Sequence, residues 1–272
     1  MIRLVFIDAD GTLHGPEGVP DCAWEAAARA RARGLHLALA TGRPNVGRAL
    51  EYARRLDAEG LHVFHQGAVV ARADGEPLHA VRFPREAYHR LVDLARALAL
   101  PIEVYATDGG IAVERSAADL ETHARLLDAS VDFADLHDFP HTREIVRVQW
   151  VVRASPAWAR ARTELDVRFA DVLSWHVGTS PSTPGVIYAS LLHREAGKLH
   201  AARWIARRMG VPMQEVAMIG DGANDIELLR AAGLGIAMGN APDEVKRAAD
   251  LVVAPVDRCG LAEALEALWR AR

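Results

Sequence analysis

The fold is decided near the start of the chain, by the sequence LVFIDADGT at residues 4–12. Its first four residues are apolar, and such a run predicts a strand buried in a parallel sheet. Asp8 and Asp10 follow at the carboxyl end of that strand, where open α/β sheets place their ligands. Residues two apart in an extended segment point to the same side, so both carboxylates can address one small site, and Gly11 lets the chain turn away.

Two carboxylates this close repel each other unless a cation or a proton lies between them. The pair at Asp8 and Asp10 therefore indicates a metal site, an acid–base pair, or both. The alternative is a solvated strand end followed by a turn.

The composition is that of an ordinary globular protein. The chain has 272 residues, of which 50% are apolar and 25% charged, enough for one large or two medium domains. The formal net charge of −4 argues against bulk nucleic-acid binding. No apolar run reaches the roughly 18 residues that a membrane span needs, so we expect no membrane partner.

The chain contains two cysteines, Cys22 and Cys259, and no CxxC motif. This pattern excludes a cysteine metal cluster and is typical of a protein in a reducing compartment. The first strand begins almost at the first residue, which leaves no room before it for a signal peptide. We therefore expect the protein to be cytoplasmic.

Strands and helices alternate at both ends of the chain. The elements expected there are, in order, strand 4–7, helix 21–34, strand 35–40, helix 44–57, strand 61–64, helix 197–209, strand 216–219, helix 224–233, strands 234–238 and 251–253, and a last helix at 261–272. Such alternation predicts an α/β fold, a Rossmann-like doubly wound parallel sheet with helices on both faces.

The middle of the chain has a different pattern. Its strands carry more polar residues, as in EIVRVQWVVR at residues 144–153, and this alternation predicts a sheet with one exposed face. We interpret residues 81–185 as an inserted α+β cap domain. The core domain is then discontinuous and consists of residues 1–80 and 186–272.

Further polar residues of the core follow predicted strands or open predicted helices. Thr41 and Gly42 end the second strand, and a hydroxyl beside a glycine N–H is a natural clamp for an oxyanion or phosphate. The alternative is that they cap the next helix. Lys198 begins a predicted helix, where its charge opposes the helix dipole unless an anionic ligand offsets it. It is one of two lysines in the chain, and the alternative is a surface lysine that tolerates this position.

The sequence GDGAND at residues 220–225 follows a strand and opens a helix. Asp221 is placed to bind a hard cation with oxygen ligands, such as Mg²⁺. Asn224 and Asp225 lie in the first turn of the helix, where they can cap it or support the ligand shell of the metal.

Together these motifs resemble those of phosphatases of the haloacid dehalogenase superfamily, specifically the Cof-type branch with a large inserted cap, subclass IIB. The matching motifs, all in the family's order, are DADGT at residues 8–12, ATGR at 40–43, Lys198, GDGAND at 220–225, and a tail of GIAMGNA at 235–241 followed by VKRAAD at 245–250. One departure is Gln66, where the family usually has asparagine. The resemblance covers the core, whereas the cap matches in position and size.

The resemblance implies a role for each of these residues. Asp8 would be the nucleophile that forms an aspartyl-phosphate, and Asp10 the general acid and then the general base. The implied Mg²⁺ site consists of Asp8, the backbone carbonyl of Asp10, and Asp221, with Asp225 near the shell. The residues implied to hold the phosphoryl oxygens are Thr41, Gly42, Asn224 and Lys198.

The resemblance thus implies a Mg²⁺-dependent phosphatase that hydrolyses phosphate monoesters of small metabolites, with sugar phosphates as the expected substrates. Two alternatives stay open. A phosphomutase would use the same core and a similar cap, but it would need a bisphosphate intermediate to turn within the site. A non-catalytic sensor of phosphorylated ligands would be expected to lack Asp10 or Lys198, and both are present.

Overall fold

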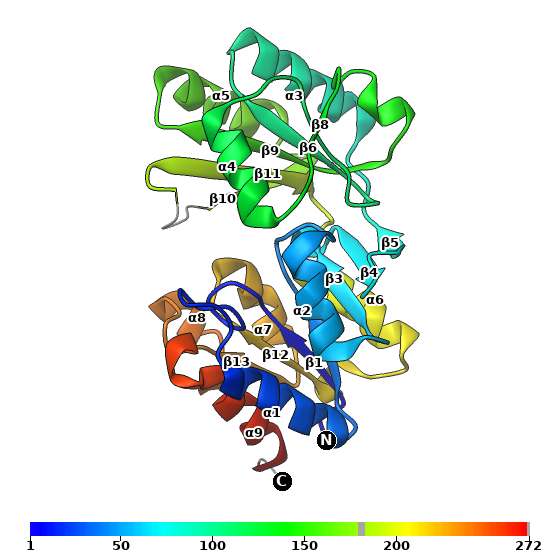
Figure 1. Ribbon diagram of the computed structural model, residues 1–272, viewed down its shortest axis with the longest axis vertical. Coiled ribbons are helices and arrows are strands. Elements are labelled where there is room, and N and C mark those ends of the chain that lie inside the picture. Colours follow the sequence, from blue (N-terminus) through cyan, green and yellow to red (C-terminus); the bar gives the residue numbers. More distant parts are fainter. Residues whose placement is uncertain (179–182, 271–272) are drawn as a thin grey trace. The chain divides into compact units, whose positions relative to one another are not determined.

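The computed structural model describes residues 1–178 and 183–270, and the chain divides into two compact units. The core unit consists of Met1–Arg43, Ala49–Leu78 and Gly197–Arg272, and the insert unit of Pro44–Arg48 and His79–Ala196. Figure 1 labels most of the helices and strands of both units. The end of the expected last helix, at 271–272, lies outside the described residues, as do residues 179–182 of the expected cap.

A five-stranded parallel sheet forms the centre of the core unit, with its strands in the order β14-β13-β12-β1-β2. The strands are β1 (Leu4–Ile7), β2 (His36–Leu39), β12 (Val216–Gly220), β13 (Leu234–Ala237) and β14 (Leu251–Val252). In the sheet, Phe6 of β1 lies opposite Ala38 on one side and Met218 on the other, and all of β1 is buried. The predicted parallel α/β sheet is confirmed.

Helices of the core unit pack on this sheet. They are α1 (Asp21–Ala32), α2 (Gly47–Asp57), α6 (Lys198–Arg208), α7 (Ile226–Ala231), α8 (Asp243–Lys246) and α9 (Gly260–Arg270), with 3₁₀ turns η1 (His65–Gly67), η3 (Met213–Glu215), η4 (Ala223–Asp225) and η5 (Val256–Arg258). Phe6 and Met218 share one apolar cluster with Ile205 of α6 and Leu228 of α7. This packing holds the carboxyl ends of β1 and β12 in fixed positions.

The third expected strand, β3 (Leu61–Phe64), does not extend the parallel sheet as its alternation with helices predicts. It pairs antiparallel with β4 (Val69–Arg72), and β5 (Pro77–Ala80) completes a three-stranded sheet. A single parallel bridge between Ala40 and Val63 links it to the core strands. The short connection η1 explains the pairing with β4, because short turns join antiparallel strands whereas parallel pairs need a long crossover.

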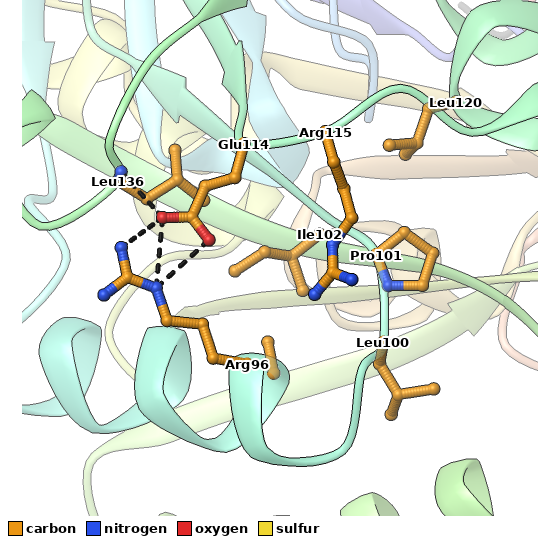
Figure 2. Close-up of a pocket in the computed structure, with 9 residues that line it drawn as sticks. Arg96, Leu100, Pro101, Ile102, Glu114, Arg115, Leu120 and Leu136 are labelled. Carbon is orange, nitrogen blue, oxygen red and sulfur yellow. Dashed lines mark hydrogen bonds and ion pairs between the residues drawn. The ribbon is translucent and has the colours of Figure 1, made fainter.

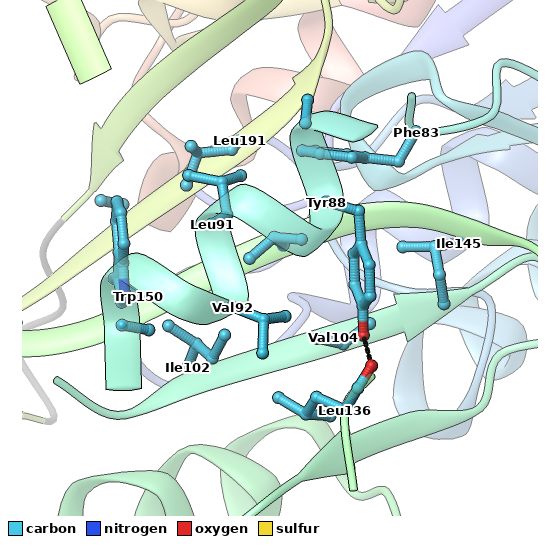
Figure 3. Packing of buried hydrophobic residues seen from close by; sticks show 14 of the residues in the cluster. Phe83, Tyr88, Leu91, Val92, Ile102, Val104, Leu136, Ile145, Trp150 and Leu191 are labelled. Atoms are coloured by element: carbon cyan, nitrogen blue, oxygen red, sulfur yellow. Dashed lines mark hydrogen bonds between the residues drawn. The ribbon is translucent and has the colours of Figure 1, made fainter. Parts of the chain in front are cut away.

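The insert unit is an α+β domain around a six-stranded sheet with the order β10-β11-β9-β6-β7-β8. Its elements are α3 (Arg85–Ala97), β6 (Ile102–Ala106), β7 (Ile111–Val113), α4 (Ala118–Leu127), β8 (Asp132–Phe133), η2 (Phe139–His141), β9 (Ile145–Arg153), α5 (Pro156–Arg168), β10 (Leu173–Gly178) and β11 (Val186–His193). Figure 3 shows its apolar core, where Leu91 and Val92 of α3 pack with Ile102 and Val104 of β6.

The insert ends later in the sequence than predicted. Strand β11 pairs with β9 and β10, so it belongs to the insert sheet rather than to the core. The chain returns to the core unit after Ala196 instead of at residue 186, and the short segment Pro44–Arg48 also belongs to the insert unit. The apolar sequence of β11 suits either sheet, and only its strand partners decide between them.

Strand β9 lacks the exposed face that its alternating sequence predicts. Every residue of the strand except the last is buried. The polar side chains are paired instead of solvated: Glu103 accepts a hydrogen bond from Gln149 at 3.1 Å, and its carboxylate lies 2.8 Å from Nδ1 of His123. Since His123 belongs to α4, this helix covers the polar face of the sheet, and polar alternation does not report exposure here.

The two cysteines form a disulfide between α1 and the residue that precedes α9. Cys22 and Cys259 lie 6.0 Å apart between their Cα atoms, although 237 residues separate them in the sequence. The expectation of a reducing compartment rests on unpaired cysteines, and disulfides are rare in such compartments, so the cysteines no longer support it. The cytoplasmic location stays a prediction.

A buried histidine of the core unit gives a test of stability. His62 accepts a hydrogen bond from the Leu39 N–H at 3.0 Å, and its Nε2 lies 2.9 Å from the carbonyl oxygen of Asp57. Burial lowers the pKa of His62 from 6.5 to about 4. Between these values the unfolded chain binds a proton that the folded chain rejects, so stability falls as pH falls.

We predict that His62→Gln flattens this dependence, because an amide keeps a donor and an acceptor without titrating. Between pH 7 and pH 5 the wild type should lose about 2 kcal/mol more unfolding free energy than the variant. Urea denaturation at several pH values measures this, with the exposed His200→Gln as the control. Equal pH slopes for wild type and His62→Gln would contradict the assignment.

Candidate active site

The core sheet brings three carboxylates together at the carboxyl ends of two neighbouring strands. β1 and β12 are adjacent and in register, with Ile7 opposite Ile219, and the chain winds in opposite directions from this point. Asp8 follows β1, Asp221 follows β12, and Asp225 ends the turn η4. One oxygen from each of the three acids lies within 4.8 Å of the others. This is the crevice in which open α/β sheets bind their ligands.

Lys198 neutralises part of this cluster. Its Nζ donates to Oδ1 of Asp8 at 2.5 Å and to Oδ1 of Asp225 at 2.6 Å, and all three side chains are buried. Burial alone would lower the pKa of Lys198, but the two carboxylates outweigh it and raise the pKa above its usual range. The lysine is therefore fully charged, and carboxylates of the protein offset its unfavourable place at the start of α6.

The cluster still has an excess of negative charge. Burial, followed by the neighbouring acids Asp225 and Asp221, raises the pKa of Asp8 well above its usual range in spite of Lys198. Burial also raises the pKa of Asp221 to about 6. Carboxylates that resist ionisation in this way gain from a nearby cation. Three converging carboxylate oxygens are a donor set that suits a hard divalent ion such as Mg²⁺.

Asp221 is held on both of its oxygens. Thr12 donates to Oδ1 at 2.8 Å, and the amide of Asn240 donates to Oδ2 at 3.2 Å. Asp225 is held in a similar way, because its Oδ2 accepts the backbone N–H groups of Asp221 and Gly222 at 3.1 and 2.9 Å. The sequence reasoning assigned no role to Asn240, although the residue lies in the GIAMGNA tail that carries part of the family resemblance.

Asp10 does not join the carboxylate cluster. Its two oxygens accept a pair of hydrogen bonds from Arg43, at 2.9 Å from Nε and 2.5 Å from a terminal nitrogen. Partial desolvation would raise the pKa of Asp10, but these hydrogen bonds and the charge of Arg43 outweigh it and lower the pKa. Arg43 thus holds Asp10 in the carboxylate form, an effect that the ATGR motif alone does not reveal.

Three of the four predicted phosphate-binding residues, Thr41, Gly42 and Asn224, lie beside Gln66. Asn224 donates to the side-chain oxygen of Gln66 at 2.7 Å. A Cβ on Gly42 would lie 2.9 Å from the Gln66 amide nitrogen, so the two are in close contact. The hydroxyl of Thr41 accepts the backbone N–H of Arg43 at 3.1 Å and stabilises a turn, whereas the alternative of a helix cap does not hold because α2 begins only at Gly47. The departure from the family at position 66 therefore lies among the predicted phosphate contacts.

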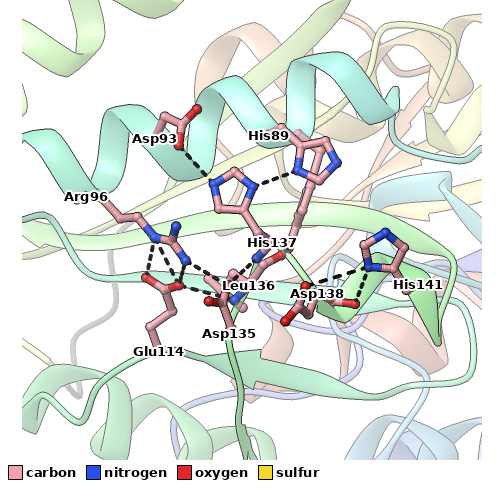
Figure 4. Close-up of polar contacts among 10 residues, drawn as sticks. His89, Asp93, Arg96, Glu114, Asp135, Leu136, His137, Asp138 and His141 are labelled. Atoms are coloured by element: carbon pink, nitrogen blue, oxygen red, sulfur yellow. Dashed lines mark hydrogen bonds and ion pairs between the residues drawn. The ribbon is translucent and has the colours of Figure 1, made fainter.

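Other polar clusters of the described residues do not offer a comparable site. Figure 2 shows a cavity of the insert unit beside the ion pair of Arg96 and Glu114, and its volume of about 10 Å³ is room for one water molecule. In Figure 4, His89 and His137 face each other with their Nδ1 atoms 3.0 Å apart, while Asp93 lies 2.9 Å from Nε2 of His137. This is a hydrogen-bonded pair, with no space for a metal between the nitrogens.

The similarity of the sequence to known proteins agrees with the geometry of this site. A family model of haloacid dehalogenase-like hydrolases matches residues 5–265. The chain belongs to this family. Its sequence is 28% identical over 270 residues, 98% of each chain, to a Haemophilus influenzae protein that is named as a candidate phosphatase.

Solved structures of haloacid dehalogenase-like hydrolases have the same fold. One from Bacteroides thetaiotaomicron is 26% identical, with a TM-score of 0.84 over 98% of this chain and 100% of that one. Another, described as the subclass IIB sugar phosphatase BT4131, is 24% identical, with a TM-score of 0.80 over 98% and 99%. The expected superfamily and its phosphatase enzyme class are confirmed. Among the described residues, none of the helices is both long and apolar enough to cross a bilayer.

The turn after β1 provides a test of this haloacid dehalogenase-like site. Gly11 has a φ of +88°, and a Cβ there would collide with the carboxylate of Asp221. Gly18 has a φ of +103°, with nothing within 4 Å of its missing Cβ. We predict that Gly11→Ala lowers kcat/KM on p-nitrophenyl phosphate at least ~10-fold, since it displaces a carboxylate of the cluster.

The matched control is Gly18→Ala, which has the same backbone penalty and no collision. It should lose about 1 kcal/mol of stability through the backbone penalty that it shares with Gly11→Ala, but keep its activity. Thermal melts of both variants measure the effect of backbone strain, and steady-state kinetics measure the effect of displacing the Asp221 carboxylate. Equal activities in the two variants would show that the fit of Gly11 against Asp221 is unimportant.

Proposed function

We propose that the protein is a Mg²⁺-dependent phosphatase that hydrolyses phosphate monoesters of small metabolites, with sugar phosphates as the preferred class, through an aspartyl-phosphate. The observation that carries this proposal is the position of Asp8, at the end of β1, in contact with Lys198 and within the group of three carboxylates. The likeness to a structure described as a sugar phosphatase supports the substrate class.

The proposed reaction has two displacements at phosphorus. In the first, an oxygen of Asp8 forms a bond to phosphorus, and the bond to the ester oxygen breaks as Asp10 gives that oxygen a proton. In the second, Asp10 removes a proton from water, whose oxygen attacks phosphorus and releases Asp8 and free phosphate. Arg43 favours the carboxylate form of Asp10, which is the form that the second step requires.

The charges of the site explain how two anions can meet. Lys198 lies within hydrogen-bonding distance of Asp8 and can extend the same contact to a phosphoryl oxygen. Thr41, Gly42 and Asn224 are proposed to hold the remaining phosphoryl oxygens. Mg²⁺, held by Asp8, Asp221 and the backbone carbonyl of Asp10 with Asp225 nearby, would supply Lewis-acid charge neutralisation.

The first test removes the nucleophile. Asp8→Asn keeps the size of the side chain but loses its negative charge, so turnover should fall at least ~1000-fold, which corresponds to about 4 kcal/mol of barrier. Phosphate release from p-nitrophenyl phosphate measures this. The control is Asp171→Asn, at an exposed position of the insert unit. Activity of Asp8→Asn within tenfold of the wild type would refute the assignment.

The second test concerns the metal. Excess chelator should abolish activity, Mg²⁺ should restore it, and Ca²⁺ should not, because Ca²⁺ takes more ligands at longer distances and would misplace the phosphate. Phosphate release with each ion after chelation and dialysis measures this. Full turnover in excess chelator would contradict the proposal, as would equal support by Ca²⁺.

A further inference from the structure

Asn240 makes an unusual set of contacts for an exposed side chain. Its amide nitrogen donates to Oδ2 of Asp221 at 3.2 Å and to the backbone oxygen of Gly11 at 2.9 Å. Its amide oxygen accepts the backbone N–H of Val256 at 2.9 Å. One side chain thus joins a candidate metal ligand, the turn after β1 and the loop before α9.

The oxygen contact fixes which end of the amide faces Asp221. The Val256 N–H is a donor, so it selects the amide oxygen and turns the NH₂ group toward the carboxylate. The loop that carries Val256 is itself anchored, because Gly239 donates to Ala254 at 3.3 Å and Gly260 donates to Pro255 at 3.1 Å. The amide is therefore oriented before any ligand binds.

The two side chains that donate to Asp221 come from different segments of the chain. Thr12 holds Oδ1 from the same turn that carries Asp8, whereas Asn240 reaches Oδ2 from the segment after β13. With both oxygens restrained, the carboxylate plane cannot rotate freely. A metal ligand that is already oriented loses less entropy when it binds its ion, and such supporting hydrogen bonds typically strengthen metal affinity ~10- to 100-fold.

We infer that Asn240 is a positioning residue for the divalent cation, acting through Asp221, and that Val256 sets its orientation. The inference rests on the metal site of the proposed function. It assigns a role to the GIAMGNA tail that the catalytic groups leave unexplained. Asn240 itself contacts the carboxylate and the Gly11 backbone, so its effect is on cation affinity rather than on bond making.

The test measures Mg²⁺ binding without substrate. Isothermal titration of metal-free protein should show a Mg²⁺ Kd at least ~10-fold higher for Asn240→Ala than for the wild type. In kinetics, the Mg²⁺ concentration for half-maximal activity should rise by the same factor, while kcat at saturating Mg²⁺ changes less than ~3-fold. Asp221→Asn removes the charge of the metal ligand itself and should give the weakest Mg²⁺ binding of the variants.

A pair of variants at Val256 tests the orienting contact: one removes its N–H and the other keeps it. Val256→Pro deletes the N–H at the first position of η5, where proline is tolerated, and should raise the Mg²⁺ Kd in the same direction as Asn240→Ala. Val256→Ala keeps the N–H and loses the side chain, so it controls for packing and should bind Mg²⁺ like the wild type. Melts of the metal-free proteins report any general loss of stability.

The outcomes separate this inference from the proposed function. An unchanged Mg²⁺ Kd in Asn240→Ala would overturn the inference even if the wild type is an active phosphatase. A higher Mg²⁺ Kd in Asn240→Ala would support the inference even if no phosphate monoester is hydrolysed. Equal Kd values for Val256→Pro and Val256→Ala would overturn the role of the N–H. Absence of Mg²⁺ binding to the wild type at millimolar concentration would overturn the inference together with the metal site.

Discussion

The site depends on one buried ammonium group. Lys198 lies between Asp8 and Asp225, which come from opposite ends of the sequence, and without a cation these two carboxylates would be costly to bury. Asp225 in turn binds the backbone N–H groups at 221 and 222, so the position of the lysine also fixes the turn after β12. Because Lys198 is the first residue of α6, a single charge ties the segment that follows the insert to the first strand.

The local parts of this arrangement could be predicted from sequence. A four-residue apolar run followed by two acids predicts the end of a strand in a parallel sheet, and the GDGAND sequence repeats the pattern at a second strand. Because the carboxyl ends of parallel strands lie at one edge of a sheet, both ends are expected there. These features depend on residues that are neighbours in the chain, and the resemblance to the family then implies one metal site of Asp8, Asp10, Asp221 and Asp225.

Other features depend on contacts between distant segments, and the sequence does not contain them in readable form. The pairing of Arg43 with Asp10 and of Gln66 with Asn224 follows from how loops meet above the sheet. The apolar sequence of strand β11 is compatible with either sheet. The alternation in β9 comes from polar residues that are buried, since Gln149 donates a hydrogen bond to Glu103 beneath α4. In each case the observed structure depends on a partner residue or strand that is distant in the sequence.

The disulfide has a consequence for the integrity of the core. Cys22 lies in the part of the core before the insert and Cys259 in the part after it, so the bridge closes a covalent ring of which the whole insert is a segment. A single backbone cut within the insert opens that ring but leaves one covalent molecule. The two halves of the core sheet, β1 with β2 and β12 with β13 and β14, would then separate only once the bridge is reduced and their packing is lost.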